Sequence, residues 1–360
     1  MGRLSRVAGA RAFVSAVGFA VFATACTTVY PATPTPSSIP APVGSAIPTP
    51  VGSVVPPTLA EFSPGSVSMW SRRAFILGGA TARDPGANVQ VAGTVAITSD
   101  EGTSFSIVTL DSRPIVDVAV GPADEAWALG SSPDGLAPAP LFHSLDGGAT
   151  WSALPAPPAQ FSHIAFALDR HGFALAIAPG TEEQVAGIDA TDDGGDSWTA
   201  VGNPCPVGTM LVGVATSGAA SAWAGCVGQP GTIEQPKAIR WTNDGGATWT
   251  TTASVDPSSG QHLGNLPSQG HLTGLASGRG GNLWAMQDRG WPLLSFDGGR
   301  TWKQVHLGEI DVAAAFAMTR DDHRESLALV WNGDARAVQL VASHDDGDTW
   351  KVVRAFPFGS

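Results

Sequence analysis

One short pattern recurs along this chain and restricts the folds that it can adopt. The stretch HSLDGGATWSAL (143–154) returns as ATDDGGDSWTAV (190–201), RWTNDGGATWTT (240–251), LSFDGGRTWKQV (294–305) and ASHDDGDTWKVV (342–353), and a weaker copy, ITSDEGTSFSIV, occupies 97–108. The first aspartates of successive copies are separated by 46, 47, 51, 53 and 48 residues. A period of this length is typical of repeated four-stranded blades.

The residues between the copies have the pattern of β-strands. Each unit contains a strand of small apolar residues, such as DVAV (117–120) or HIAFA (163–167), and then a strand that often carries an aromatic residue, such as AWALG (126–130). A third strand enters the repeated pattern and a fourth leaves it, with Gly, Pro and Asp clusters between strands. No segment has a convincing helical pattern.

A single sheet of this kind cannot cover both of its own faces, whereas blades stacked around an axis can. We therefore expect an all-β fold, a six-bladed β-propeller of four-stranded antiparallel blades that occupies residues 62–360. A seven-bladed ring is the alternative, and it needs roughly another 45 residues of blade sequence. Each of the six units contains its own four strands, so we see no strand left over to close the ring by exchange between the termini; the segment around Leu59 to Phe62 is the alternative for that role.

The N-terminal region differs from the repeats. Residues 1–25 combine three arginines with an uncharged run of 14 residues (12–25), which is shorter than the about 20 residues of a membrane span and has the length of a signal-peptide core. Ala23, Thr24 and Ala25 precede Cys26 and resemble a bacterial lipoprotein cleavage site, which implies that Cys26 carries the lipid anchor. We expect an exported, lipid-anchored protein; secretion with an incidental cysteine is the alternative.

Residues 26–61 are predicted to form a linker. They contain nine prolines, and no charged residue occurs between 27 and 60. Such a segment cannot bury a core and favours extended polyproline II structure.

Charge excludes one class of function. The formal net charge is −12, so phosphate backbones and anionic lipid surfaces repel the chain. We expect no nucleic-acid partner, contact with a membrane only through the lipid anchor, and a monomer.

The repeated pattern, Ser/Thr-x-Asp-x-Gly-x-Ser/Thr-Trp/Phe, resembles the Asp-box, or BNR repeat, of sialidases, sortilin-type receptors, some xyloglucan-active hydrolases and photosystem assembly factors. An aspartate in such a turn can accept backbone hydrogen bonds, and the following glycine permits a positive φ. One turn offers too few oxygens for calcium. We therefore expect a structural role for Asp100, Asp146, Asp193, Asp244, Asp297 and Asp345, and for Phe105, Trp151, Trp198, Trp249, Trp302 and Trp350, the aromatics that can fill the gaps between blades.

The resemblance also implies which loops bind a ligand, because in Asp-box propellers the ligand side is opposite the boxes, at the loops after the second and fourth strands. The candidate binding residues on these loops are Glu182, Glu234, His262, His271, Asp288, Arg289, Trp291 and Glu309. Trp291 beside Arg289 can anchor a protein or a sugar, although a tryptophan packed under its own loop fits as well. Cys205 and Cys226 lie within one blade of an exported chain and are expected to form a disulfide; two free buried thiols are the alternative.

The number and position of tyrosines exclude sialidase activity. A sialidase needs a tyrosine nucleophile, and the one tyrosine of this chain, Tyr30, lies outside the propeller. A two-carboxylate glycosidase stays open, with candidate acids at Glu182, Glu183, Glu234, Asp256, Asp288 and Glu309. HExxH, GxSxG and phosphate-loop motifs are absent, and the histidines are scattered.

We expect no catalytic residue, no metal and no cofactor. The expected function is a non-catalytic, membrane-anchored binding or assembly propeller that recognises a protein partner in the cell envelope through its loop side. The alternative is a carbohydrate-active or glycan-binding propeller: a glycoside hydrolase, a lyase or a glycan-binding lipoprotein.

Overall fold

The computed structural model describes residues 58–83, 90–132, 137–167, 169–178, 185–218, 220–307, 312–318 and 325–357. The expected signal segment (1–25), the expected lipid-anchor residue Cys26 and all but the last residues of the expected linker (26–61) lie outside the described residues. Glu182, Glu183 and Glu309 also lie outside them. Within the described residues, helical structure is limited to two short 3-10 segments, η1 (Leu59–Glu61) and η2 (Arg279–Gly281).

The strands of the first three blades follow one another along the chain. The first blade contains β1 (Phe62–Met69), β2 (Phe75–Arg83), β3 (Gln90–Thr98) and β4 (Ser106–Asp111). The second contains β5 (Ile115–Val120), β6 (Ala126–Gly130), β7 (Leu141–Ser144) and β8 (Ser152–Ala153). The third contains β9 (Phe161–Phe166), β10 (Gly172–Ile177), β11 (Val185–Thr191) and β12 (Thr199–Gly202).

The other three blades repeat this order, with one addition. The fourth contains β13 (Met210–Gly218), β14 (Ser221–Val227), β15 (Lys237–Thr242), β16 (Thr250–Asp256) and an extra outer strand, β17 (Gln261–Leu263). The fifth contains β18 (His271–Ser277), β19 (Leu283–Asp288), β20 (Leu293–Ser295) and β21 (Lys303–Gln304). The sixth contains β22 (Val312–Met318), β23 (Ser326–Asn332), β24 (Ala337–Ser343) and β25 (Lys351–Pro357).

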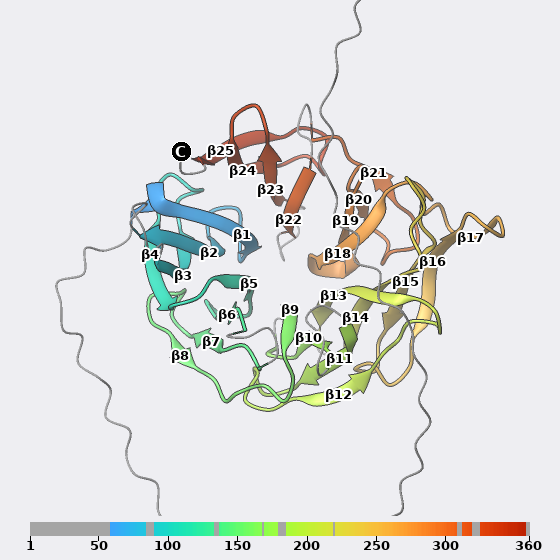
Figure 1. Cartoon of the computed structure of the whole chain (residues 1–360), viewed down its shortest axis with the longest axis horizontal. Helices are drawn as coiled ribbons and strands as arrows, with labels where there is room; N and C mark the ends of the chain where they lie inside the picture. The colour runs from blue at the N-terminus through green and yellow to red at the C-terminus, as the bar shows by residue number, and fades with distance from the viewer. Residues whose placement is uncertain are drawn as a thin grey trace, which may run out of the picture. The chain divides into compact units, whose positions relative to one another are not determined.

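Each blade is an antiparallel sheet whose strands are ordered as in the sequence. The six sheets stand around a central axis, with the first strand of each blade innermost (Figure 1). The chain is therefore a six-bladed β-propeller, as the repeat predicts. Every described blade is built from consecutive strands, so blade 1 and blade 6 meet as complete sheets.

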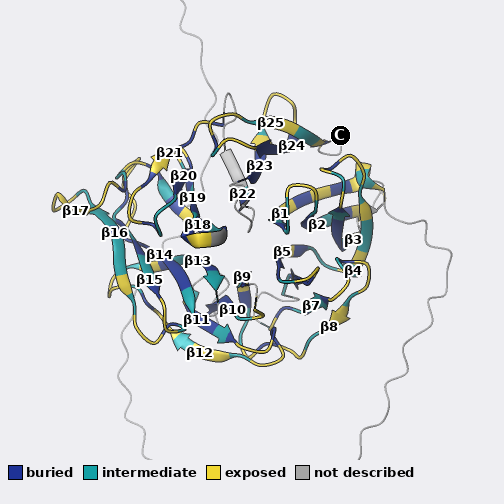
Figure 2. Cartoon of the chain, turned by 180° about the vertical axis from the view of Figure 1, so that it is seen from behind, coloured by how far each residue is buried: buried dark blue, intermediate teal, exposed yellow. Residues whose placement is uncertain are grey.

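The second strand of a blade is the most deeply buried, because neighbouring blades cover both of its faces. All residues of β6 and β10 are buried, whereas both residues of the outer strand β8 are exposed (Figure 2). A strand covered on both faces needs a continuous apolar run, and AWALG and GFALAI have one. The two-residue alternation that marks a half-exposed strand is absent from them.

The repeated acidic turns connect the third and fourth strands and share one hydrogen-bond network. In blade 4, Asp244 Oδ1 accepts from the Thr242 hydroxyl (2.7 Å) and from the Thr248 backbone N–H (2.9 Å), while Oδ2 accepts from the Thr248 hydroxyl (2.6 Å). The hydroxyls of Thr242 and Thr248 and the Thr248 N–H together hold the pKa of Asp244 down to about 2. The same bonds surround Asp100, Asp146, Asp193, Asp297 and Asp345.

Glycine is required in these turns for two reasons. Gly246 has a φ of 96°, a conformation that side chains with a Cβ rarely adopt. A Cβ at Gly246 would also lie 2.4 Å from Cγ1 of Val201, a residue of the preceding blade. The turn thus brings its backbone against the sheet of the preceding blade, and the glycine permits that approach.

The aromatic that ends each turn packs at an interface between blades. Buried apolar residues form six clusters, one between each pair of neighbouring blades. The turn aromatics join these clusters, each on the side of the preceding blade: Phe105, Trp151, Trp198, Trp249, Trp302 and Trp350. Each indole N–H donates to a glycine carbonyl within its own turn, for example from Trp249 Nε1 to Gly246 O (3.0 Å).

The interface between blades 6 and 1 closes the ring by side-chain packing. The ring of Phe356 on β25 contacts Phe62 edge to face, with centroids 5.9 Å apart, and contacts Phe105 at 6.4 Å. At the turn side, Arg72 of blade 1 pairs with Glu325 of blade 6 (3.7 Å). Hydrophobic contact, with the Arg72–Glu325 ion pair beside it, therefore holds this interface together.

A turn aromatic should contribute measurably to stability. Trp302 is only 6% exposed, so Trp302→Ala leaves a cavity between blades 4 and 5 and should lower the free energy of unfolding by roughly 3–5 kcal/mol. Urea unfolding of the purified chain measures this change. Val352→Ala, at a side chain on β25 that is 57% exposed, is the control and should change stability little. Equal effects of the two substitutions would contradict a wedging role for the aromatic.

Candidate functional site

The blade topology separates two sides of the ring. The turn side contains the acidic turns and the connections between first and second strands. Hydrogen bonds link an acidic turn to such a connection, for example from Gly147 N–H to Asp124 O (2.8 Å). The loop side contains the connections between second and third strands and those from one blade to the next. Between the two sides, the innermost strands enclose a central cavity of about 210 Å³.

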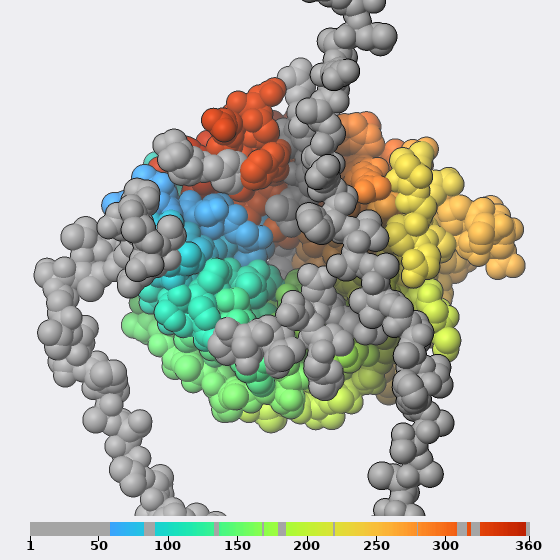
Figure 3. Space-filling view, in the orientation of Figure 1, coloured from blue at the N-terminus to red at the C-terminus, as the bar shows by residue number. Residues whose placement is uncertain are grey.

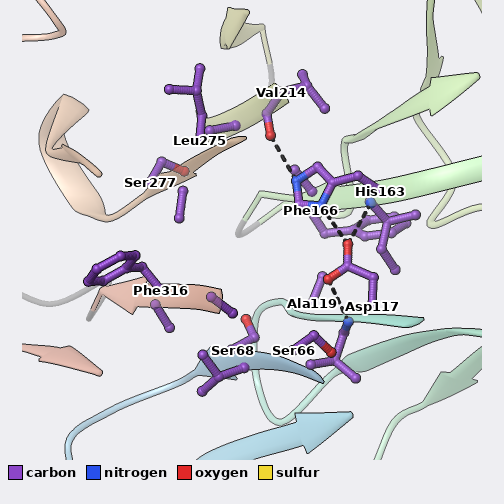
Figure 4. Close-up of a pocket in the computed structure, with 18 of the residues that line it drawn as sticks. Ser66, Ser68, Asp117, Ala119, His163, Phe166, Val214, Leu275, Ser277 and Phe316 are labelled. Atoms are coloured by element: carbon purple, nitrogen blue, oxygen red, sulfur yellow. Dashed lines mark hydrogen bonds and ion pairs between the residues drawn. The ribbon is translucent and has the colours of Figure 1, made fainter. Parts of the chain in front are cut away.

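Small and apolar side chains from all six blades line most of this cavity. Asp117 of β5 and His163 of β9 stand out on one wall, with Phe316 and Leu275 across from them (Figure 4). Asp117 is the one carboxylate among the described lining residues. A two-carboxylate glycosidase needs two acids about 5–10 Å apart, and the described wall of the cavity does not offer that pair.

The Asp117–His163 pair connects three blades. His163 Nδ1 donates to Asp117 Oδ2 (2.6 Å), and His163 Nε2 donates to the Val214 carbonyl of blade 4 (3.0 Å). Both ring nitrogens thus face acceptors, and only the doubly protonated imidazolium satisfies both. Burial opposes the charge, but the Asp117 carboxylate and both hydrogen bonds outweigh it and raise the pKa of His163.

Asp117 is itself held by backbone groups. Its Oδ1 accepts from the Val118 N–H (2.9 Å), and its Oδ2 also accepts from the Ile164 N–H of blade 3 (2.9 Å). Further polar bonds join innermost strands of neighbouring blades: Val120 N–H donates to Ser68 Oγ (3.2 Å), and the Ser277 hydroxyl donates to the Thr216 carbonyl. The polar groups of the cavity therefore bond mainly to the protein itself, which favours a structural role for the Asp117–His163 pair.

Asp117 and His163 are not among the site residues that the sequence pattern singles out. Asp117 and His163 stand within the segments DVAV and HIAFA, which read as small apolar strands. The available signal was a charged residue inside an otherwise apolar innermost strand, since such a residue needs a buried partner.

Six of the predicted loop-side candidates are described, and most of them gather over blades 4 and 5. Asp288 ends β19 and His271 begins β18, and their Oδ1 and Nδ1 atoms lie 3.4 Å apart. Arg289 donates from Nη1 to the Thr232 carbonyl of blade 4 (3.1 Å). Trp291 is 38% exposed, and its ring lies 4.3 Å from the exposed His306 ring.

The two remaining candidates lie further out. Glu234 lies in the connection between β14 and β15, and its carboxylate accepts a hydrogen bond from the Ser268 hydroxyl (2.8 Å). His262 is an exposed residue of β17, the extra strand of blade 4, which projects beyond the ring (Figures 1 and 3). His262 and His271 thus occupy different strands. In the part of the chain that the structure describes, no group of three or more His, Cys, Asp or Glu side chains is arranged to hold a metal ion.

Lys237, the first residue of β15, is a buried cation beneath these loops. It is 3% exposed, and its Nζ donates to the carbonyls of Gln269 (2.8 Å) and Gly270 (2.5 Å). The Gln287 amide, oriented with its oxygen 3.1 Å from this Nζ, donates from its nitrogen to the Trp291 carbonyl (3.0 Å). Each ammonium hydrogen therefore has a carbonyl acceptor, and burial lowers the pKa of Lys237 to about 8.

The loop from Asn203 to Thr209, which enters blade 4, is held at its base. A disulfide joins Cys205 to Cys226 at the end of β14. The Arg240 guanidinium donates to the carbonyls of Pro204 (2.6 Å) and Trp249 (2.6 Å). The fully exposed Val207 lies in the turn above these contacts, which is closed by a bond from Thr209 N–H to Pro206 O (3.0 Å).

Exposed large apolar side chains concentrate on the loop side. On the loop side, the exposed large hydrophobic residues are Val91, Val116, Val207, Met210, Ile233, Trp291 and Trp331. The others, Leu145 in an acidic turn and Leu263 and Val352 on outer strands, are scattered. A concentration of exposed apolar side chains on one face is typical of an interaction surface.

Comparisons with known proteins find similarity only to solved structures. No family model and no curated protein matches it. It is similar to YCF48 bound to a D1 peptide, with 19% sequence identity over 81% of this chain and 82% of that chain and a TM-score of 0.45. It is also similar to YCF48 from Cyanidioschyzon merolae, with 16% identity over 82% of this chain and 86% of that chain and a TM-score of 0.46. A third similar structure is the GH74 xyloglucanase from Xanthomonas campestris, with 15% identity over 81% of this chain and 47% of that chain and a TM-score of 0.47. This chain therefore spans about half the length of that enzyme. Within the described residues, no helix has the length and hydropathy to cross a membrane.

The His163 pair should make stability depend on pH near neutrality. The pKa of His163 is higher in the folded chain than its ordinary value of 6.5. The contribution of His163 to the free energy of unfolding is therefore complete below pH 6.5 and is lost as the pH rises through the pKa of the folded chain. His163→Gln should remove this loss from the pH dependence of urea unfolding. The exposed His262→Gln is the matched control and should leave the profile unchanged. A wild-type profile that is already flat above pH 6.5 would contradict the paired imidazolium.

Lys237 should have the opposite dependence. Between its folded pKa of about 8 and its ordinary value of 10.5, the unfolded chain holds a proton that the folded chain has lost, so this residue's contribution to stability increases with pH. The stability of wild type relative to Lys237→Met should therefore rise from pH 8 to pH 10, by up to about 3 kcal/mol. Paired denaturation curves measure the difference, and a constant difference across that range excludes a buried lysine with a lowered pKa.

Proposed function

We propose that this chain is a non-catalytic binding or assembly propeller that recognises a protein partner through its loop side. The observation that carries the proposal is the set of exposed apolar side chains on that side, from Val116 at the cavity to Trp331 on β23. Burial of apolar area is the main favourable term in protein association. In the described acidic turns of the turn side, by contrast, Leu145 is the exposed large hydrophobic residue.

The proposal includes the place of the protein in the cell. We infer that residues 1–25 direct export and that a lipid on Cys26 anchors the chain, as a monomer, at the outer face of the cytoplasmic membrane or in the cell envelope; secretion without an anchor is the alternative. The Cys205–Cys226 disulfide supports an extracytoplasmic location, since disulfides persist in oxidising compartments. We also propose that the six acidic turns are Asp-boxes, because their sequence pattern and their shared hydrogen-bond network support that assignment.

Glycan binding is the second candidate, and Trp291 favours it. An indole that is 38% exposed, with the Asp288 carboxylate and the Arg289 guanidinium in the same connection, can stack against a sugar ring and bond its hydroxyls. The aliphatic side chains nearby, Val207, Met210 and Ile233, offer no such bonds and fit a protein surface better. Protein recognition therefore explains more of the loop side.

Capture from cell-envelope extract tests the proposal. The intact chain should retain a protein in stoichiometric amount, and Trp291→Ala combined with Trp331→Ala should reduce its recovery at least tenfold, because both side chains belong to the exposed apolar set. Leu145→Ala, at an exposed apolar residue of the turn side, is the matched control and should not reduce it. Turnover of any sugar in a glycoside panel would overturn the proposal. An equal reduction of partner recovery by Leu145→Ala would overturn it as well.

A further inference from the structure

We propose that the loop side of blades 4 and 5 forms a contact surface for a segment of a protein partner that carries apolar side chains next to a lysine or arginine. This inference rests on the proposed function and adds the surface and the chemistry of the partner. The surface has two parts: an apolar ledge, made of Val207, Met210, Ile233 and Trp291, and an acidic groove beside it.

The ledge residues lie on two neighbouring blades, blade 4 and blade 5. Met210 pairs with Val227 at the loop-side end of β13 and β14, so Val207 and Met210 lie over blade 4. Ile233 follows in the next loop of the same blade, and the bond from Arg289 Nη1 to Thr232 O ties that loop to the connection that contains Trp291. The ledge side chains are 38–107% exposed, so their apolar area is available to a partner.

A disulfide and several hydrogen bonds brace the loops that carry the ledge. The Cys205–Cys226 disulfide and the Arg240 guanidinium fix the base of the Val207 turn. Lys237 joins the 269–270 backbone to Gln287, which in turn bonds to the Trp291 carbonyl. A surface that is ordered before binding loses less conformational entropy when it binds, so this bracing favours recognition of a partner.

The acidic groove lies between the Ile233 loop and the extra strand β17. It has a volume of about 470 Å³, and its lining includes Glu234, Asp256 and His262. Glu234 follows Ile233 directly, and its bridge to Gln269 places the groove next to the ledge. Strand β17 occurs only in the fourth of the described blades, so the groove has no counterpart in the other five.

The charge of the groove selects a basic side chain. Hydrogen bonds from Ser258 and Ser259 hold the Asp256 carboxylate and lower its pKa, so it is ionised at neutral pH. His262 is the one described lining side chain that can carry a positive charge. The chain as a whole has 31 acidic residues against 19 lysines and arginines, and such an excess speeds the approach of a basic partner.

A peptide array tests the surface with defined probes. The intact chain is applied to synthetic peptides of one length in which Leu or Trp stands two to five residues from Lys, with matched sets in which Glu replaces Lys or Ser replaces the apolar residue. We expect the Lys–apolar set to bind best. Binding should weaken at least tenfold in Ile233→Ser combined with Trp291→Ala, and about fivefold in Glu234→Gln, whose remaining binding should depend less on salt.

The controls separate this surface from the rest of the chain. Leu145→Ser and Asp348→Asn alter exposed residues of the turn side and should leave peptide binding unchanged. Preference for the Glu-containing set, or equal weakening by the control variants, would overturn the proposal. Retention of a partner from envelope extract by Ile233→Ser with Glu234→Gln would overturn this surface while leaving the proposed function intact.

Discussion

The structure depends on the contact between neighbouring blades. A four-stranded sheet of this chain has two apolar faces, and its second strand, such as β6 or β10, has no polar side to turn toward water. Only another blade on each face can bury it, so the ring must close. The acidic turn makes that contact tight, because its glycines let the backbone approach the preceding sheet and its aromatic fills the space between the two.

The interface between blades 6 and 1 uses the same means as the others. In the described residues the first and last sheets are each complete, so no shared strand joins the termini. Phe105, the turn aromatic of blade 1, packs against Phe356 of blade 6. The turn tryptophans of the other blades pack against their preceding blades in the same way. The ion pair between Arg72 and Glu325 adds a polar contact, but with Arg72 46% exposed its contribution is small compared with the buried apolar area.

Two of the buried charged groups in the described chain, Asp117 and Lys237, serve different ends. In the centre, the Asp117–His163 pair bonds to three blades and leaves few polar groups for a ligand. Under the loop side, Nζ of Lys237 donates to the backbone carbonyls of Gln269 and Gly270 and holds together loops that carry exposed apolar residues. The first arrangement stiffens the ring, and the second shapes a surface. The recognition surface that we propose therefore lies mainly on the loops of blades 4 and 5.

Much of the fold follows from local pattern in the sequence. The number of blades, the order of their strands and the six acidic turns are all visible there, because a turn needs Asp, Gly and Ser or Thr at fixed offsets and a covered strand needs an apolar run. The loop-side position of Asp288, Arg289 and Trp291 follows from the same repeat, once the turns define the opposite side. Tertiary structure alone shows that His163 faces Asp117 and Val214, that Lys237 lies under the Trp291 connection, and that Glu234 and Asp256 share a groove. These pairs come from different strands or blades, and their distances depend on how the sheets pack, which spacing along the chain does not encode.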